Sequence, residues 1–419
     1  MTMTLSSLLN LCQVPAALED VTCRGTEVDP RSVGVEPAGV DAIWAAVERF
    51  YRSGLHPALQ LCVRRRGQVL LDRAIGHAAG NGPDEPADAP RVPVTTDTPF
   101  CIFSASKAVT AMIVHLLDDR GLLHVNDAVS EYIPEFARHG KERVTIEHVM
   151  THRAGIPNMP PDQMQLDTLA DPARIVQVLC DAEPAWAPGR RLAYHAITGG
   201  FILAEIVRRV AGKDIRAVLR EAVLEPLGFR WMNYGVAPEH VPAVARNAFT
   251  GPRPLSPLAA LARRVLGVEF TEVAGLANDP RWFEAIVPAA NICTSANELS
   301  RFYQLLLDGG TLDGVRVYEP RTIRRATSEQ SYLELDLTLG VPTHYSMGFI
   351  LGGFPFYGPD TPHAFGHLGF INIVSWADPE RRLAVALTNS GKPFFFPEMW
   401  FLYDVMRQIA LACPKEGAA

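Results

Sequence analysis

The chain has 419 residues, of which 48% are hydrophobic and 20% are charged, and its formal net charge is −7. This composition is typical of a globular protein with two or three domains, or with one domain that carries a large insertion, and it excludes a mostly disordered chain. The acidic balance, without a basic stripe, argues against a nucleic-acid partner, and no run of about 18 apolar residues predicts a transmembrane helix.

The seven cysteines are an odd number, lie far apart and form no CxxC motif. This pattern argues against a disulfide framework and against a zinc ribbon, and it favours reduced thiols in a cytoplasmic protein. The N-terminal segment lacks the basic region of a cleaved signal peptide, which also favours a cytoplasmic location.

The first predicted elements are a helix and a hairpin. Residues Val40–Tyr51 carry apolar side chains at helical spacing. Two β-like runs follow, Ala58–Arg64 and Gln68–Ala74, and the basic run at 64–66 is interpreted as a solvated turn. Residues 77–96 are rich in Pro, Asp and Gly and predict a surface loop.

The middle of the chain is predicted to be mostly helical. The clearest pattern covers Ala105–Asp119, where apolar residues recur at helical spacing and Gly121 follows the end. Helices are also expected at Gly200–Val210, before Gly212, and at Glu298–Leu307.

The C-terminal part returns to β structure. Alternating apolar runs at Phe370–Trp376 and Arg382–Asn389 predict a hairpin, and a helix over Glu398–Leu411 closes the chain. Strands therefore lie at both ends of the chain and helices between them. This order predicts one antiparallel sheet built from both chain ends, with a helical domain inserted.

The chemistry-bearing motif is Ser104-Ala105-Ser106-Lys107, an SxxK sequence, whereas the GxSxG, HExxH and Walker A motifs are absent. Ser104 falls at the start of the best-predicted helix, where free backbone N–H groups and the helix dipole favour negative charge. Lys107 follows one turn later, and burial would lower its pKa so that it could act as a base. The alternative is that Ser104 only caps the helix and Lys107 is a solvated helix residue.

Six segments in order resemble the serine β-lactamase-like hydrolases with the class C β-lactamase fold, which include carboxylesterases, D-amino-acid peptidases and acyltransferases. The segments are PFCIFSASKAVTAMIVHLLDDRGLL, VTIEHVMTHRAGIP, APGRRLAYHAITGGFILAEIVRRVAGKDI, EPLGF, TSANELSRFYQLLLDGG and FGHLGFINIVSWADPERRLAVALTNS. The resemblance runs from about residue 36 to 411.

The resemblance implies an α+β fold like that of class C β-lactamases and penicillin-binding proteins, with a central antiparallel sheet flanked by helices and an inserted helical domain. Residues 1–105 and 290–419 would form the sheet domain and residues 106–289 the helical domain. The active site would lie between the two.

The resemblance also implies the roles of individual residues. Ser104 would be the nucleophile and Lys107 its base, and Tyr194 matches the family's catalytic tyrosine. A phenol beside an ammonium group is expected to have a lowered pKa and to pass the serine proton to the leaving group. The backbone N–H groups of Ser104 and Phe370 would form the oxyanion hole.

The family's third motif corresponds to His367-Leu368-Gly369, which would bind the substrate. The family's Tyr-x-Asn reads Tyr194-His195-Ala196 here, and Ala196 has no side chain that can hydrogen-bond. This departure puts amide and lactam recognition in doubt but leaves the serine chemistry intact. His195 is interpreted as an exposed or structural residue.

The sequence therefore predicts a carboxylesterase that forms an acyl-enzyme on Ser104 with a small-molecule ester, without a cofactor or metal. Within the family, a β-lactamase, a D-amino-acid peptidase or an acyltransferase is the alternative. From other classes, a non-catalytic acyl- or peptide-binding sensor and a metallohydrolase stay open. The metallohydrolase would use the pairs His148/His152 and His363/His367.

An aromatic cluster near the C-terminus suggests an apolar acyl pocket, although such clusters are more often part of the core or of a lid. It comprises Phe354, Phe356, Tyr357 and residues 394–396.

Overall fold

The computed structural model describes residues 9–86, 88–160, 163–256, 258–353, 355–394 and 398–416. The first part of the N-terminal segment, to which the signal-peptide prediction refers, lies outside these residues.

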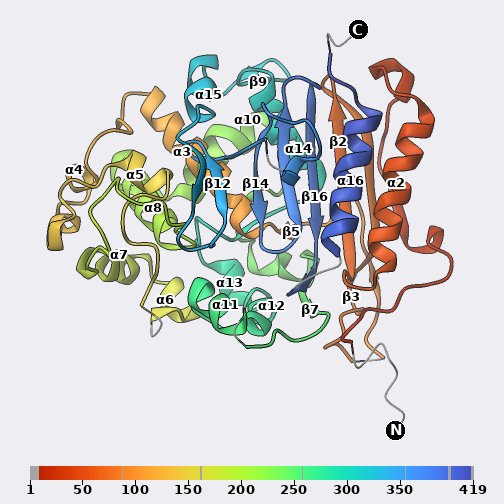
Figure 1. Ribbon diagram of the computed structural model, residues 1–419, viewed down its shortest axis with the longest axis horizontal. Coiled ribbons are helices and arrows are strands. Elements are labelled where there is room, and N and C mark those ends of the chain that lie inside the picture. Colours follow the sequence, from red (N-terminus) through yellow and green to blue (C-terminus); the bar gives the residue numbers. More distant parts are fainter. Residues whose placement is uncertain are drawn as a thin grey trace.

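The centre of the molecule is a ten-stranded antiparallel sheet (Figure 1). Its strand order is β1 (Thr22–Arg24), β3 (Gln68–Ala79), β2 (Ala58–Arg65), β16 (Leu383–Asn389), β15 (Ile373–Asp378), β14 (Phe365–Gly369), β13 (Ile350–Leu351), β12 (Pro342–Tyr345) and β11 (Ser331–Leu335), with β4 (Val92–Pro93) paired to β3. The two ends of the chain meet where β2 pairs with β16, with Leu61 opposite Leu387. The predicted antiparallel sheet built from both chain ends is therefore confirmed, whereas the predicted domain boundaries stay a prediction.

Alternation along the strands gives each face of the sheet its own core. In β16, Val385 and Leu387 belong to a core beneath α2 (Pro37–Arg52) and α16 (Glu398–Ala412), which lie side by side in Figure 1. Ala384 and Ala386 face the opposite way, where α14 (Ala296–Leu307) packs on the sheet. Small residues on that face let the helix approach closely, and the large residues fill the other core.

The basic run at 64–66 is not a solvated turn, because β2 is a central strand and buries most of it. Arg64 is 9% exposed and Arg65 only 2%. Arg64 donates from Nε to Ser300 Oγ (3.0 Å), and Arg65 donates from Nε to a backbone carbonyl (3.1 Å). Only Arg66, with a φ of +52°, belongs to the turn itself. Buried guanidinium groups persist where most of their donors find acceptors, as they do here at Arg64 Nε and Nη2 and at Arg65 Nε and Nη2.

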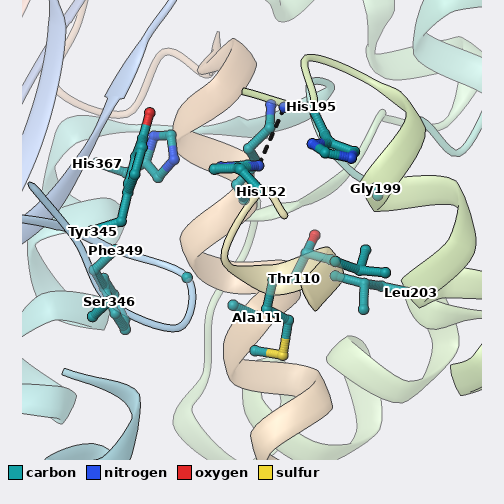
Figure 2. A pocket seen from close by; sticks show the side chains of 15 residues that line it. Thr110, Ala111, His152, His195, Gly199, Leu203, Tyr345, Ser346, Phe349 and His367 are labelled. Atoms are coloured by element: carbon teal, nitrogen blue, oxygen red, sulfur yellow. Dashed lines mark hydrogen bonds between the residues drawn. The ribbon is translucent and has the colours of Figure 1, made fainter. Parts of the chain in front are cut away.

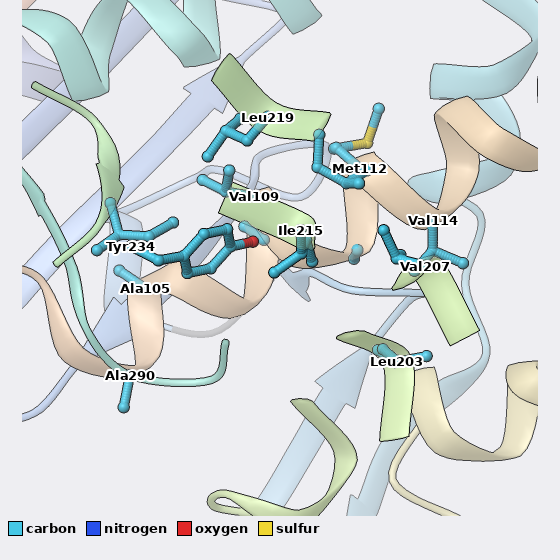
Figure 3. Packing of buried hydrophobic residues seen from close by; sticks show 14 of the residues in the cluster. Ala105, Val109, Met112, Val114, Leu203, Val207, Ile215, Leu219, Tyr234 and Ala290 are labelled. Carbon is cyan, nitrogen blue, oxygen red and sulfur yellow. The ribbon is translucent and has the colours of Figure 1, made fainter. Parts of the chain in front are cut away.

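The helical part of the molecule is assembled around α3 (Ser106–Asp119), as Figure 3 shows. Val109 and Met112 of α3 pack against α8 (Thr198–Ala211) and α9 (Ile215–Leu219). The remaining described helices are α4 (Val129–Tyr132), α5 (Ile146–Met150), α6 (Leu166–Leu169), α7 (Pro172–Asp181), α10 (Glu225–Leu227), α11 (Leu258–Leu266), α12 (Val273–Leu276), α13 (Pro280–Glu284) and α15 (Pro320–Ala326). The predicted helices at 105–119, 200–210, 298–307 and 398–411 are confirmed to within a few residues.

Two small sheets join distant parts of the chain: β5 (Phe100–Cys101) with β8 (Ile292–Thr294) and β6 (Asn233–Tyr234), and β17 (Gly391–Pro393) with β7 (Ala248–Thr250). A third, β9 (Thr311–Leu312) with β10 (Val315–Arg316), is a local hairpin. The seven cysteines are unpaired, as predicted. Within the described ranges, no helix is long and apolar enough to cross a membrane.

We expect Leu61→Ala to lower the free energy of unfolding by about 2–5 kcal/mol, because it removes a fully buried side chain from the core beneath α2 and α16. Leu255→Ala is the matched control, since Leu255 is 79% exposed and its truncation should cost less than about 0.5 kcal/mol. Equilibrium urea unfolding measures both. Equal losses in the two variants would contradict the predicted core.

Candidate active site

Ser104 lies in a short 3₁₀ turn, Phe103–Ala105, that leads directly into α3. Its side chain is half-buried, at the end of the helix where backbone N–H groups are free. The preceding residue, Phe103, has a φ of +45°, which a residue with a bulky side chain rarely adopts. Such strain persists only where the surroundings hold it, and it commonly marks a functional site.

The amine of Lys107 is the nearest charged group to the Ser104 hydroxyl. Lys107 Nζ lies 3.2 Å from Ser104 Oγ and donates to the carbonyl oxygens of Ala196 (2.8 Å) and Ala289 (3.1 Å). All three partners are neutral and the side chain is buried, so burial lowers the pKa of Lys107 to about 7. Close to neutral pH this amine can therefore lose its proton and accept one from the hydroxyl.

Tyr194 lies beside both groups. Its ring centroid is 4.7 Å from Lys107 Nζ, and its hydroxyl interacts with Ser104. The expected lowering of the Tyr194 pKa is wrong, because burial raises this pKa more strongly than the bond to Ser104 lowers it. The negative charge of Asp336 raises it further. Tyr194 is therefore a neutral phenol at pH 7, able to donate a proton but not to stand as a phenolate.

Asp336 also fixes the backbone of Tyr194. The fully buried Asp336 accepts from the Tyr194 N–H at 3.0 Å and from two N–H groups of its own loop, those of Thr338 and Leu339. A buried carboxylate bonded to several N–H groups holds the attached backbone rigidly. Asp336 thus positions Tyr194 from a loop 142 residues away in the sequence.

Behind Lys107 a small cavity of about 30 Å³ is walled by three histidines, His152, His195 and His367 (Figure 2). The His152 ring lies 4.8 Å from the Tyr194 ring, and His152 Nδ1 accepts from the His195 N–H at 3.2 Å. Burial lowers the pKa of His195 to about 4 and that of His367 to about 3, and it also lowers that of His152 well below its ordinary value. All three rings are therefore neutral at pH 7. His195 is fully buried, so it is not an exposed residue, and its structural role stays a prediction.

Of the two histidine pairs considered as metal ligands, only one member of each, His152 and His367, lines this cavity. Among the residues that the structure describes, no group of three or more His, Cys, Asp or Glu could hold a metal ion.

The motif at 367–369 lies on β14, as expected, but its two side chains differ in direction. His367 lines the cavity behind Lys107, whereas Leu368 is partly buried and packs against the core beneath α2 and α16. The substrate-binding role of the motif stays a prediction. Gly369 allows β14 to approach the nucleophile, because a Cβ there would lie 2.3 Å from the carbonyl oxygen of Ile102.

Phe370 was expected to begin a strand, but it opens the turn between β14 and β15, which starts at Ile373. The next two residues, Ile371 and Asn372, have φ values of +51° and +62°. This left-handed pair breaks the strand. The Phe370 ring lies 5.5 Å from the ring of Phe103, so the two proposed oxyanion donors belong to neighbouring segments. Their role in an oxyanion hole stays a prediction.

A second, apolar pocket of about 110 Å³ opens beside Ser104. Its other lining residues are all hydrophobic: Phe103, Met164, Leu166, Leu169, Ala196, Ile197, Leu266, Val268, Val273, Leu276, Ala277, Trp282, Ala290 and Phe370. Ala196 stands where the family's asparagine is expected, so this wall offers no amide group. Most of the pocket is thus formed by residues between 164 and 282, many of them on short helices, and not by the C-terminal aromatic cluster.

The aromatic cluster lies elsewhere. Tyr357 stacks on Trp376 in the core beneath α2 and α16, and Phe356 packs against the same core. Phe394 contacts Phe270 at a ring distance of 4.7 Å. Residues 354, 395 and 396 lie outside the described residues.

Sequence reasoning did not place two residues of this site correctly. His152 was considered only as a metal ligand paired with His148, and not as a neutral ring beside Tyr194. Asp336 had no signal, since nothing local distinguishes a loop aspartate that will be buried against Tyr194.

Comparison with known proteins identifies similar chains over nearly the whole length. A family model described as Beta-lactamase matches residues 45–405. The protein "Esterase/beta-lactamase LipL" of Mycobacterium tuberculosis is 31% identical over 343 residues, 78% of each chain. A solved penicillin-binding protein homologue from Caulobacter crescentus is 28% identical, with a TM-score of 0.77 over 90% of this chain and 99% of its own. A solved family VIII carboxylesterase is also 28% identical, with a TM-score of 0.75 over 89% and 98%.

We expect a fluorophosphonate to label Ser104 at a rate that falls as the pH drops below about 7. The reason is that Lys107, whose pKa is about 7, must be neutral to accept the serine proton, and it is protonated at lower pH. The second-order rate constant measured from pH 5 to 9, with the adduct located by mass spectrometry, tests this.

Ser104→Ala should abolish the labelling. An adduct on another serine, or a rate that does not change between pH 5 and 8, would contradict the roles assigned to Ser104 and Lys107.

Proposed function

The chain belongs to the β-lactamase family and is a hydrolase of the β-lactamase fold, and on this premise we propose that it is a carboxylesterase that acts through an acyl-enzyme on Ser104. One observation carries the proposal. The Ser104 hydroxyl lies 3.2 Å from a buried amine on one side and opens on the other side into a pocket lined by hydrophobic residues alone.

In the acylation step, neutral Lys107 accepts the Ser104 proton while Oγ attacks the carbonyl carbon of the ester. The carbonyl oxygen becomes an oxyanion that the N–H groups of Ser104 and Phe370 stabilise. Because the Lys107 amine returns to its protonated form here, it holds the proton that the leaving group needs.

When the tetrahedral intermediate collapses, the bond from the carbonyl carbon to the alkoxy oxygen breaks. The Tyr194 hydroxyl, which interacts with Ser104, passes its proton to the departing alkoxide and is reprotonated by Lys107. A water molecule then repeats the sequence on the acyl-enzyme and releases the acid.

The acyl group and the alcohol of the ester are proposed to bind on different sides of Ser104. A leaving alcohol must reach its proton donor, and Tyr194 does not line the apolar pocket, whereas Ser104 and Phe370 do. The acyl group therefore occupies the apolar pocket, and the alcohol lies toward Tyr194. Burial of apolar acyl surface contributes roughly 25 cal/mol per Å² to binding.

The apolar pocket also favours esters over β-lactams and peptides. The amide side chain of a β-lactam would lie beside Ala196 without a hydrogen-bond partner, which costs about 1–3 kcal/mol. An ester also needs less assistance for its leaving group than an amide. The names of two similar proteins, an esterase/β-lactamase and a family VIII carboxylesterase, support the same choice.

We expect kcat/KM for p-nitrophenyl butyrate to exceed that for nitrocefin and for a D-Ala-D-Ala peptide. Ala196→Asn should raise the ratio of nitrocefin to butyrate hydrolysis by roughly 5- to 150-fold, because it restores an amide partner worth about 1–3 kcal/mol. Ala196→Leu, which adds bulk without a hydrogen bond, is the matched control.

A wild-type enzyme that prefers nitrocefin or the peptide would overturn the esterase assignment. Absence of a nitrophenol burst from any activated ester would favour a non-catalytic sensor, and faster product formation with added alcohol, with the new ester detected, would favour an acyltransferase.

We expect Val268→Phe to narrow the apolar pocket and to lower kcat/KM for longer acyl chains while leaving acetate esters little changed. Val268 lines the pocket and is only half-buried, so the larger ring can be accommodated. A series of p-nitrophenyl esters from acetate to octanoate measures the effect. A parallel series of acetates with longer alcohols is the control, and a loss confined to that series would reverse the assignment of the two halves.

A further inference from the structure

A second buried lysine, Lys392 of β17, lies close to the nucleophile without lining either pocket. It is 1% exposed, and its Nζ donates to both the carbonyl oxygen and the Oδ1 of Asn389, each at 3.0 Å. Burial lowers the pKa of Lys392 to about 7. The proposed chemistry uses only Lys107, so the presence of this costly buried amine requires another explanation.

The bond to Lys392 fixes the orientation of the Asn389 amide. With Oδ1 held by the amine, the Asn389 Nδ2 points the opposite way and donates to the carbonyl oxygen of Ile371 at 3.1 Å. Ile371 and Asn372 are the left-handed pair that follows Phe370. Left-handed residues with side chains need external support, and Asn389 bonds directly to this turn.

The same amine touches the other strained segment. Lys392 Nζ lies 5.0 Å from the ring centroid of Phe103, the residue with a φ of +45° directly before Ser104. A cation over an aromatic face is attracted to it, and more strongly when both are shielded from water. Lys392 therefore contacts Phe103 directly and reaches the turn after Phe370 through Asn389.

We infer that Lys392 and Asn389 are positioning residues that hold the two halves of the oxyanion hole, the Ser104 N–H and the Phe370 N–H, at a fixed separation. This inference rests on the proposed function. An apolar side chain at 392 would fill the same space without burying an amine, but it could not orient the Asn389 amide. The long lysine side chain is thus explained by the two segments that it connects.

A positioning role predicts a lower catalytic rate with little change in substrate binding. Neither Lys392 nor Asn389 lines the acyl pocket, so their loss removes no direct contact with a bound acyl group. Charge develops on the carbonyl oxygen only in the transition state, so a misplaced N–H donor lowers kcat and leaves KM nearly unchanged.

The test compares two variants. Lys392→Met keeps an unbranched side chain only one atom shorter and removes the donors, and Asn389→Asp keeps an acceptor for Lys392 and removes the donor to Ile371. We expect each to lower kcat for p-nitrophenyl butyrate at least tenfold with KM changed less than twofold. The kcat of the double variant should be no lower than that of the more severe single variant, because Lys392 acts on the turn through Asn389. The fall in activity below pH 7 should persist, since Lys107 is intact.

Lys213→Met is the matched control, because Lys213 is an exposed lysine that pairs with Glu221. Unchanged kcat in both variants, equal effects on kcat and KM, or strictly additive losses would overturn the inference. Circular dichroism and the thermal midpoint identify a variant that fails to fold. If Lys392→Met or Asn389→Asp does so, the kinetics of the other variant test the positioning role.

Fluorophosphonate labelling separates this inference from the proposed function. The phosphoryl oxygen gains charge in the same hole, so slower labelling of Lys392→Met is expected even if the wild-type enzyme hydrolyses no ester. An unchanged labelling rate in Lys392→Met and Asn389→Asp would overturn the positioning role, whereas absence of ester hydrolysis in the wild type would overturn only the proposed function.

Discussion

The rest of the site depends on one contact, the buried Lys107 amine against the Ser104 hydroxyl. The other two oxygens on that amine are the carbonyls of Ala196 and Ala289, which come from segments far apart in the chain. A carboxylate in their place would keep the amine protonated at neutral pH. Neutral carbonyl oxygens hold the amine in position without strongly stabilising its protonated form. This is the condition under which Lys107 can act as a base, as proposed.

The division between chemistry and selectivity follows the architecture. Lys107 and Tyr194, the groups proposed to transfer protons, lie on α3 and on the segment before α8. The loop that carries Asp336 holds the backbone of Tyr194, and β14 contacts α3. The apolar pocket is formed largely by short helices between residues 164 and 282. Changes in those short helices can alter the acyl group that fits while the Ser104–Lys107 contact stays as it is.

Periodicity was sufficient to predict the elements whose pattern repeats along the chain. Both faces of β16 are buried, but large residues alternate with small ones between the two cores, and α3 is buried almost throughout with its apolar residues at helical spacing. Both elements can therefore be predicted from the local sequence. Ser104 and Lys107 were found because three residues of helix bring them together, while Tyr194 needed the family resemblance. The buried Arg64, the loop residue Asp336 and the second lysine, Lys392, could not be found. Their roles depend on partners more than a hundred residues away, and so does the burial that raises the pKa of Tyr194.

The pairing of β2 with β16 has a consequence for the order in which the protein is made. β2 ends at residue 65 and β16 begins at residue 383, so at about 5–20 residues per second the ribosome needs roughly 15–60 s to supply the missing neighbour. During that interval the nascent β2–β3 hairpin has an open edge that a chaperone can cover. Ser104 is synthesised early, but Phe370 and Lys392 are synthesised near the end. The contact between the segments of Phe103 and Phe370 can therefore form only when translation is almost complete.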